Sequence, residues 1–206
     1  NSGRFMHVPR QALRSCILDE VRPGTIRWGS RLQGFNCWAD DTKKRGEANG
    51  VTVTLTDGTT LDAALLVGSD GIHSTVRKAL ALPGDRLQYA GLVVVLGITP
   101  AVPALAQRRI FETVDGTTRI YAMPFTTSST MWQLSFPYAE TEARTLVKDR
   151  TALMDEILRR CGGWHEPIPE LLRGTPPGGM SGYPVYVRET LDPEVLRPSI
   201  KTAGQV

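Results

Sequence analysis

The sequence predicts an α+β protein whose two halves differ in texture. Up to about Leu82, short strands alternate with helical stretches, and an apolar strand runs through a Gly-rich turn into a helix. After Pro83-Gly84, alternating apolar residues joined by tight turns favour a mostly antiparallel sheet. The expected architecture is therefore an α/β portion followed by a larger β layer that carries a helical segment.

Composition places the chain among ordinary globular proteins. It has 206 residues, of which 41% are hydrophobic and 22% are charged. The net charge of +3 is weak and mixed in sign, which argues against nucleic acid and anionic membranes as partners. The longest apolar run, about Leu92 to Ile98, is far too short to span a membrane. A soluble globular protein is expected.

The cysteines exclude some site chemistries. Cys16, Cys37 and Cys161 are widely spaced and odd in number, and no CxxC pair occurs. The pattern therefore supports neither a zinc site nor a disulfide framework, and no metal is expected. A reducing compartment, the cytoplasm, follows from the same pattern.

The first half begins with a helix. Apolar residues recur at helical spacing after Pro9, which suits a first helical position, and Arg22-Pro23-Gly24 ends the helix. Cys16 falls on the apolar face and is expected in the core. A polar loop is expected at 40–49, and Asp57-Gly58 supplies a hairpin turn. The strands expected in this half are 26–28, 32–39, 51–55, 60–63 and 65–67.

The second half is expected to be dominated by one sheet. Asp115-Gly116 predicts a hairpin, a helix is expected from Thr141 to Cys161, and Gly162-Gly163 ends that helix. The last forty residues are rich in proline and are expected to contain one strand. The strands expected in this half are 87–98, 110–114, 118–123, 131–138 and 185–190.

The stretch LLVGSDGIHSTVRKAL is the part of the chain that points to chemistry. A strand that enters a Gly-rich turn and a helix from Ser74 exposes amide groups that favour an anion such as a phosphate. Asp70 itself repels phosphate, so it would bond ribose hydroxyls, pair with Arg77, or tie the turn together. Arg77 would either pair with Asp70 or meet a second nucleotide. The alternative is a plain turn whose Gly, Asp and Ser serve only as caps.

Three stretches resemble one family. GSDGIHSTVRKAL resembles the "DG" motif of FAD-dependent aromatic hydroxylases and monooxygenases of the para-hydroxybenzoate hydroxylase type. HVPRQALRSCILDEV resembles the helix of that family whose leading arginine lies against the flavin nucleotide. IRWGSRL is similar to branches that include salicylate hydroxylase-like and tetracycline-degrading enzymes.

The resemblance implies a role for five residues. Arg10 would contact FAD, and Asp70 and Gly71 would lie near the FAD pyrophosphate. Asp70 and Arg77 are also implicated in the use of NAD(P)H, and His73 occupies a position that faces the nicotinamide cofactor in some relatives. No catalytic side chain is implied, because the oxygen is transferred from a flavin hydroperoxide and the cofactor carries the chemistry.

The resemblance also implies how the chain is divided. Residues 1–82 would be part of an FAD-binding domain that holds the DG motif, 83–190 a β-rich substrate-binding domain, and 191–206 a truncated return to the FAD domain. The family's GxGxxG and GDAAH-type motifs are absent. We therefore expect an internal fragment with an incomplete FAD/NAD(P)-binding fold that is inactive and binds FAD poorly alone.

The predicted function is that of an FAD-dependent monooxygenase. With NAD(P)H and O₂ it would hydroxylate or epoxidise a small organic substrate, aromatic or polycyclic. Two alternatives stay open: a flavin reductase or halogenase of the same fold, and a non-catalytic truncated product or pseudoenzyme. Trp132, in the expected substrate sheet, either lines an aromatic pocket or belongs to the core.

Overall fold

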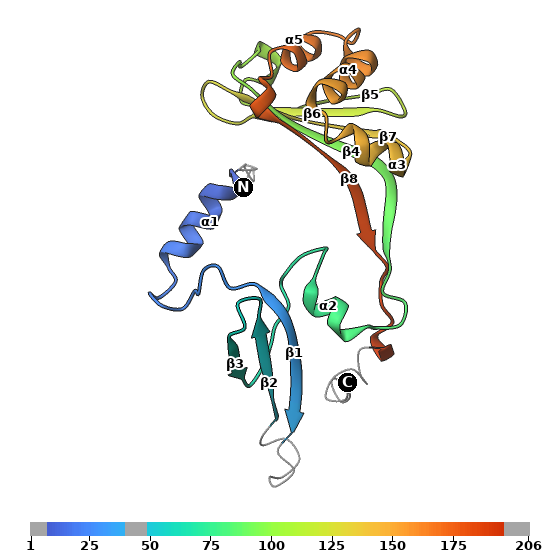
Figure 1. Ribbon diagram of the computed structural model, residues 1–206. Coiled ribbons are helices and arrows are strands. Elements are labelled where there is room, and N and C mark those ends of the chain that lie inside the picture. Colours follow the sequence, from blue (N-terminus) through green and yellow to red (C-terminus); the bar gives the residue numbers. More distant parts are fainter. Residues whose placement is uncertain (1–7, 40–48, 196–206) are drawn as a thin grey trace. The chain divides into compact units, whose positions relative to one another are not determined.

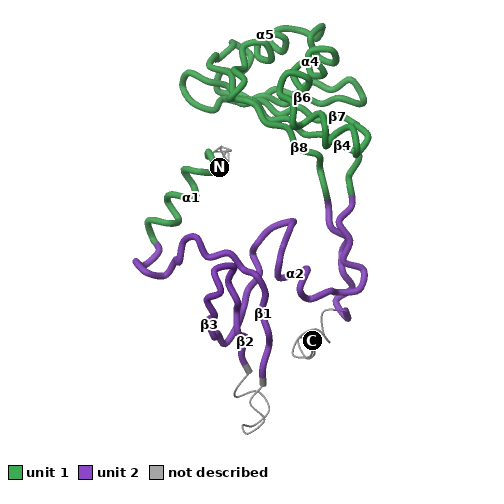
Figure 2. Tube along the Cα trace, viewed as in Figure 1, with its two compact units in different colours: residues 1–20, 89–186 green, residues 21–88, 187–206 purple. Residues whose placement is uncertain are grey.

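A computed structural model describes residues 8–39 and 49–195 (Figure 1). The chain divides into two compact units, which Figure 2 colours separately. Unit 1 comprises residues 1–20 and 89–186, and unit 2 comprises residues 21–88 and 187–206. The predicted loop at 40–49 lies almost wholly outside the described residues.

A five-stranded sheet forms the centre of unit 1, with strand order β5-β6-β7-β4-β8. The neighbours β5–β6, β6–β7 and β7–β4 pair antiparallel, which confirms the predicted sheet type. Asp115 stabilises the predicted hairpin turn, because its carboxylate accepts hydrogen bonds from the amides of Thr117 and Thr118. The strands are β4 Leu87–Thr99, β5 Phe111–Val114, β6 Arg119–Pro124, β7 Thr130–Pro137 and β8 Met180–Arg188.

One face of this sheet is packed and the other is only partly covered. Along β7 every second residue from Thr130 to Phe136 is buried, as the period of a half-buried strand requires. The helices α3 Glu140–Leu146, α4 Arg150–Cys161 and α5 Ile168–Arg173 lie on one side of the sheet (Figure 1). Together the buried residues of these strands and helices form one apolar core.

Trp132 belongs to this core. Its side chain is fully buried, and its indole Nε1 donates to Thr175 Oγ1 at 2.9 Å and to Thr99 Oγ1 at 3.2 Å. A Cβ at Gly97 would lie 2.2 Å from the indole ring, so only glycine leaves room for it. The core interpretation of Trp132 is therefore the one that the structure supports.

Two expectations for the helical segment were wrong. The single helix predicted at 141–161 is interrupted, because the Asp149 side chain accepts from the amides of Thr151 and Ala152 and starts a second helix. The proline-rich tail contains α5, which the sequence did not predict. Its Ile168 and Leu172 are buried, so packing against the core stabilises a helix whose short sequence shows no helical pattern. Short 3₁₀ turns occur at Ala104–Ala106 and Pro177–Gly179.

The N-terminal helix is placed as predicted but is not packed. It is α1 Arg10–Asp19, with Pro9 one position earlier than expected, at the N-cap. None of its residues is buried, and Cys16 is exposed instead of lying in the core. Cys161, at the end of α4, is the cysteine that lies in the core, and burial raises the pKa of its thiol to about 12.

Unit 2 contains a small antiparallel sheet of order β1-β2-β3. Its strands are β1 Leu32–Ala39, β2 Asn49–Leu55 and β3 Thr60–Ala63, joined after β2 by the predicted Asp57-Gly58 turn. The helix predicted after the Gly-rich turn is present but shorter, as α2 Thr75–Leu80.

Two predicted strands of unit 2 are not formed. Residues 26–28 are irregular, and so are residues 65–67, where Leu65 is 75% and Val67 is 71% exposed. A strand needs a neighbour to satisfy its backbone amides and carbonyls, and no described strand pairs with either segment. The prediction of a buried strand at 65–67 rested on apolar character alone. The described residues contain no sheet in which this segment pairs.

The α+β class is confirmed. Among the residues that the structure describes, no helix has the length and apolar character needed to cross a bilayer. Nor do the described residues contain a group of three or more His, Cys, Asp or Glu side chains arranged to hold a metal ion.

Candidate functional site

The Gly-rich turn before α2 is held together by its own polar groups. Asp70 Oδ2 accepts from the amide of Thr75 at 2.6 Å and from that of Val76 at 3.2 Å. The Ser74 hydroxyl oxygen accepts from the amide of Arg77 at 2.9 Å, as an N-cap does. Gly71 has a φ of +76°, a conformation that glycine adopts without strain. Asp70 therefore ties the turn together, one of its three predicted roles.

The carboxylate of Asp70 takes the place that an external anion would otherwise occupy at the start of α2. The pKa of Asp70 is lowered, chiefly by a hydrogen bond from Ser74 and then by the amides of Val76 and Thr75. Since these amides are committed within the turn, a phosphate at this place would have to be met by other donors. The predicted capping role is thus the one that the local geometry supports.

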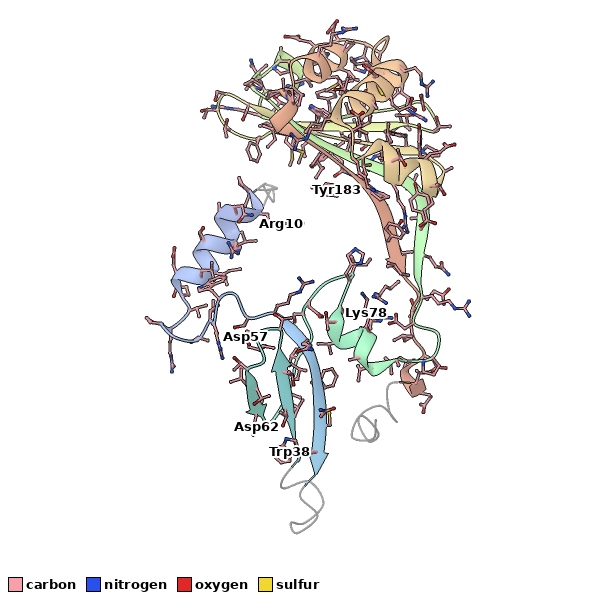
Figure 3. The ribbon with its side chains drawn as sticks, viewed as in Figure 1. Arg10, Trp38, Asp57, Asp62, Lys78 and Tyr183 are labelled. Atoms are coloured by element: carbon pink, nitrogen blue, oxygen red, sulfur yellow. The ribbon has the colours of Figure 1, made fainter. Side chains whose placement is uncertain are left out.

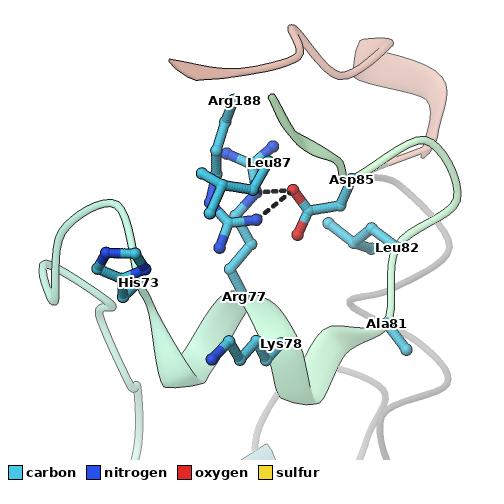
Figure 4. A pocket seen from close by; sticks show the side chains of 8 residues that line it. All are labelled: His73, Arg77, Lys78, Ala81, Leu82, Asp85, Leu87 and Arg188. Atoms are coloured by element: carbon cyan, nitrogen blue, oxygen red, sulfur yellow. Dashed lines mark hydrogen bonds and ion pairs between the residues drawn. The ribbon is translucent and has the colours of Figure 1, made fainter. Parts of the chain in front are cut away.

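Other donors gather in a pocket beside α2, with a volume of about 470 Å³ (Figure 4). Its walls come from the end of the DG turn, from α2, from the loop that follows α2, from the start of β4, and from the end of β8. The lining residues are His73, Arg77, Lys78, Ala81, Leu82, Asp85, Leu87 and Arg188. All of them belong to unit 2.

A single carboxylate organises the two arginines of this basic pocket. Arg77 Nε lies 2.8 Å from Asp85 Oδ1, and Arg188 donates through a terminal nitrogen to the same oxygen at 2.7 Å (Figure 4). The Asp85 side chain is only 9% exposed. Arg77 therefore pairs with Asp85, and the predicted alternative, an ion pair with Asp70, is not the one that forms.

The basic pocket has more positive than negative charge. Arg77, Lys78 and Arg188 contribute three cations, against the one carboxylate of Asp85. The Nε of Arg77 is buried and lies 2.8 Å from Asp85 Oδ1, so its charge is met by this ion pair. A pocket with a surplus of positive charge fits an anionic group such as a phosphate.

The five predicted site residues fall in three places. His73 and Arg77 line the basic pocket, whereas Asp70 and Gly71 form the exposed turn that leads to it. Arg10 is exposed on α1 in unit 1, at the edge of a small apolar hollow of about 250 Å³ (Figure 3).

Sequence reasoning missed Lys78, Asp85 and Arg188. Lys78 follows Arg77 directly and was available as a second cation on the same helix. Asp85 follows Pro83-Gly84, where an aspartate suggests only a turn. Arg188 lies 103 residues beyond Asp85, and no local pattern connects the two.

Comparison with known proteins identifies the family. Residues 6–167 match the model of a family described as FAD binding domain. The chain belongs to this family. The predicted resemblance of the chain to FAD-dependent monooxygenases and hydroxylases is thereby confirmed.

Its relatives include several FAD-dependent enzymes. Aurachin C monooxygenase/isomerase of Stigmatella aurantiaca is 28% identical over 169 residues, which cover 82% of this chain and 40% of that protein. The FAD-dependent urate hydroxylase of Klebsiella pneumoniae is 28% identical over 171 residues, which cover 82% and 41%. The chain therefore spans about two fifths of the length of these relatives.

Solved structures agree on the fold. The structure of Klebsiella pneumoniae HpxO with FAD and uric acid superposes with a TM-score of 0.72 at 25% identity, covering 89% of this chain and 44% of that one. A salicylate hydroxylase in complex with substrate superposes with a TM-score of 0.64 at 16% identity. The latter likeness concerns the fold alone.

Proposed function

We propose that the protein acts as an FAD-dependent monooxygenase that uses NAD(P)H and O₂ to oxygenate a small organic substrate, aromatic or polycyclic. The observation that carries the proposal is the family match over residues 6–167, with relatives that are FAD-dependent monooxygenases and hydroxylases. A cytoplasmic location, expected from the cysteine pattern, stays a prediction.

The DG turn and the basic pocket contribute the cofactor contacts in this proposal. Asp70 and Gly71 shape the turn near the FAD pyrophosphate, and His73 and Arg77 meet NAD(P)H in the basic pocket. The surplus positive charge of that pocket supports a phosphate-bearing cofactor there. When bound, FAD supplies the redox and oxygen chemistry, and the side chains bind, orient and exclude water.

The sheet of unit 1 is proposed to carry the substrate on the face opposite to α3, α4 and α5. Tyr121 and Leu96 flank Gln133 in register on that face, and all three are half-buried. An apolar surface with a central amide and a phenol suits a small ring with polar substituents. This assignment follows the predicted division into a nucleotide part and a β-rich substrate part.

The experiment measures substrate-dependent consumption of NADH and NADPH by the protein expressed from its complete reading frame. Uric acid and 3-amino-4-hydroxybenzoate are the first substrates to test, because relatives are named for acting on them. A yellow flavoprotein whose substrate acquires one oxygen atom per NAD(P)H supports the proposal. NAD(P)H oxidation without an oxygenated product indicates a reductase, halogenated product with chloride or bromide indicates a halogenase, and a flavin-free protein indicates a non-catalytic product.

Arg10 provides a mutational test of the flavin contact. Arg10→Ala should lower the flavin content of the purified protein, because a guanidinium that contacts the flavin nucleotide is lost. Flavin absorbance per mole of protein measures this. Arg22→Ala, which removes an exposed arginine of unit 2, is the matched control. Equal flavin content in both variants would remove Arg10 from the site.

A further inference from the structure

The DG turn is attached to a segment far along the chain. Arg188, the last residue of β8, donates from Nε to the carbonyl of Ile72 at 2.8 Å across 116 positions. Ile72 stands between Gly71 and His73, so this bond acts on the backbone that presents His73. Arg77 donates in turn to the carbonyl of Glu189 at 3.3 Å.

Asp85 makes this arrangement possible. Arg77 and Arg188 approach the same carboxylate oxygen, and without its charge two guanidinium groups at this separation would repel each other. The side chains of Asp85 and Arg188 are 9% and 13% exposed, so water screens these interactions only in part. A planar guanidinium donates from separate nitrogens, so Arg188 reaches Asp85 and a backbone carbonyl from two positions, whereas a lysine has a single nitrogen for both.

We infer that Asp85 is a positioning residue of the basic pocket. By holding Arg188, and through it the carbonyl of Ile72, it sets the conformation of the turn that presents His73 and Arg77. The identification of the ligand as NAD(P)H rests on the proposed function. The positioning itself concerns residues of unit 2 alone.

The negative charge of Asp85 and its positioning of the arginines have opposite effects on the affinity for an anionic ligand, so one substitution distinguishes them. Asp85→Asn adds one unit of positive charge to the basic pocket. If Asp85 only moderates that charge, the variant binds NAD(P)H more tightly. If Asp85 positions the arginines and the turn, the variant binds NAD(P)H more weakly in spite of its more favourable charge.

The first measurement is hydrogen exchange of the amides from Ser74 to Arg77, all of which are bonded within the turn. In Asp85→Asn and in Arg188→Gln these amides should exchange about tenfold faster, because the turn opens more often. Arg188→Lys should not restore protection, since its single nitrogen replaces the two separate nitrogens that make these bonds. The matched controls are Asp62→Asn and Arg22→Gln, two exposed residues of unit 2 outside the pocket.

The second measurement is steady-state kinetics of the flavin-loaded protein. Asp85→Asn should raise the KM for NAD(P)H about fivefold to tenfold and leave the KM for the organic substrate unchanged. Asp85→Glu, which keeps the carboxylate, should recover part of the loss. A merely structural role would move both KM values together.

The outcomes separate the two proposals. Unchanged exchange in both Asp85→Asn and Arg188→Gln, or a lowered KM for NAD(P)H in Asp85→Asn, overturns the positioning role. A wild-type protein that does not oxidise NAD(P)H overturns the proposed function, and the exchange experiment then still decides whether Asp85 positions the turn. Should Asp85→Asn fail to fold, Arg188→Gln carries the same exchange test.

Discussion

The surroundings of Trp132 in unit 1 and the DG turn in unit 2 are stabilised in different ways. Trp132 is fully buried, and apolar neighbours on strands and helices close around it. Around the DG turn, Ser74 and Leu82 are buried, whereas Leu65 and Val67 remain largely exposed. Hydrogen bonds and ion pairs hold this turn, and the predicted cofactor residues of unit 2 all lie on it or next to it.

The difference shows which kind of change each region tolerates. Apolar burial is insensitive to pH, but removal of a large buried side chain costs several kcal/mol. A turn held by carboxylates and guanidiniums opens more easily and responds to single charges. The candidate site therefore lies around the DG turn, where protonation of one carboxylate or removal of one charge by substitution can alter the conformation.

The largest effect is expected in the core of unit 1. Trp132→Ala should destabilise the protein by about 3–5 kcal/mol, because it leaves a cavity and deprives Thr99 and Thr175 of an indole donor. Urea unfolding followed by circular dichroism measures this. Trp28→Ala, at a position that is 65% exposed, should cost much less. Equal costs at the two tryptophans would contradict the view that burial stabilises unit 1.

An intermediate effect is expected at the cap of α2. Ser74→Ala should cost about 1 kcal/mol locally, because the amide of Arg77 loses its side-chain acceptor. Hydrogen exchange of the α2 amides detects the change, with Thr75→Ala as a neighbouring variant that keeps the cap. Loss of protection in the five-stranded sheet of unit 1 as well would mean that the two regions unfold together, and the contrast would fail.

The smallest effect is a pH dependence of the same turn. The pKa of Asp70 lies below its ordinary value of 3.8, so its bonds to the amides stabilise the turn above that value and are lost as the pH falls through the lowered pKa. Asp70 is exposed, so the change is modest. The proton shift of the Thr75 amide should titrate with a midpoint below 3.8, and Asp70→Asn should abolish that titration. A midpoint above 3.8 would contradict the capping role.

Local patterns predicted much of the fold. The four strands expected between 87 and 138 are present within a few residues, because alternation with a period of two reports a half-buried strand directly. The Asp57 and Asp115 turns are also where Asp-Gly predicts them. The prediction of a strand at 65–67 was wrong because an apolar segment forms a buried strand only where a neighbouring strand pairs with it.

Two of the residues that line the basic pocket could be predicted in the same way. His73 and Arg77 belong to a recognisable motif, whereas Asp85 and Arg188 have no pattern of their own. Their importance arises from proximity across 103 positions, which periodicity, turn chemistry and composition do not encode.

The sequence by itself determined the α+β class, the antiparallel type of the larger sheet, the place of the DG turn, and the resemblance to flavin-dependent monooxygenases. All of these depend on interactions between residues a few positions apart or on a contiguous motif. Only the tertiary structure decided that Arg77 pairs with Asp85, that Arg188 holds the Ile72 carbonyl, and that Trp132 belongs to the core. These contacts join distant segments, and packing of the whole chain selects them from many partners that the local sequence leaves equally available.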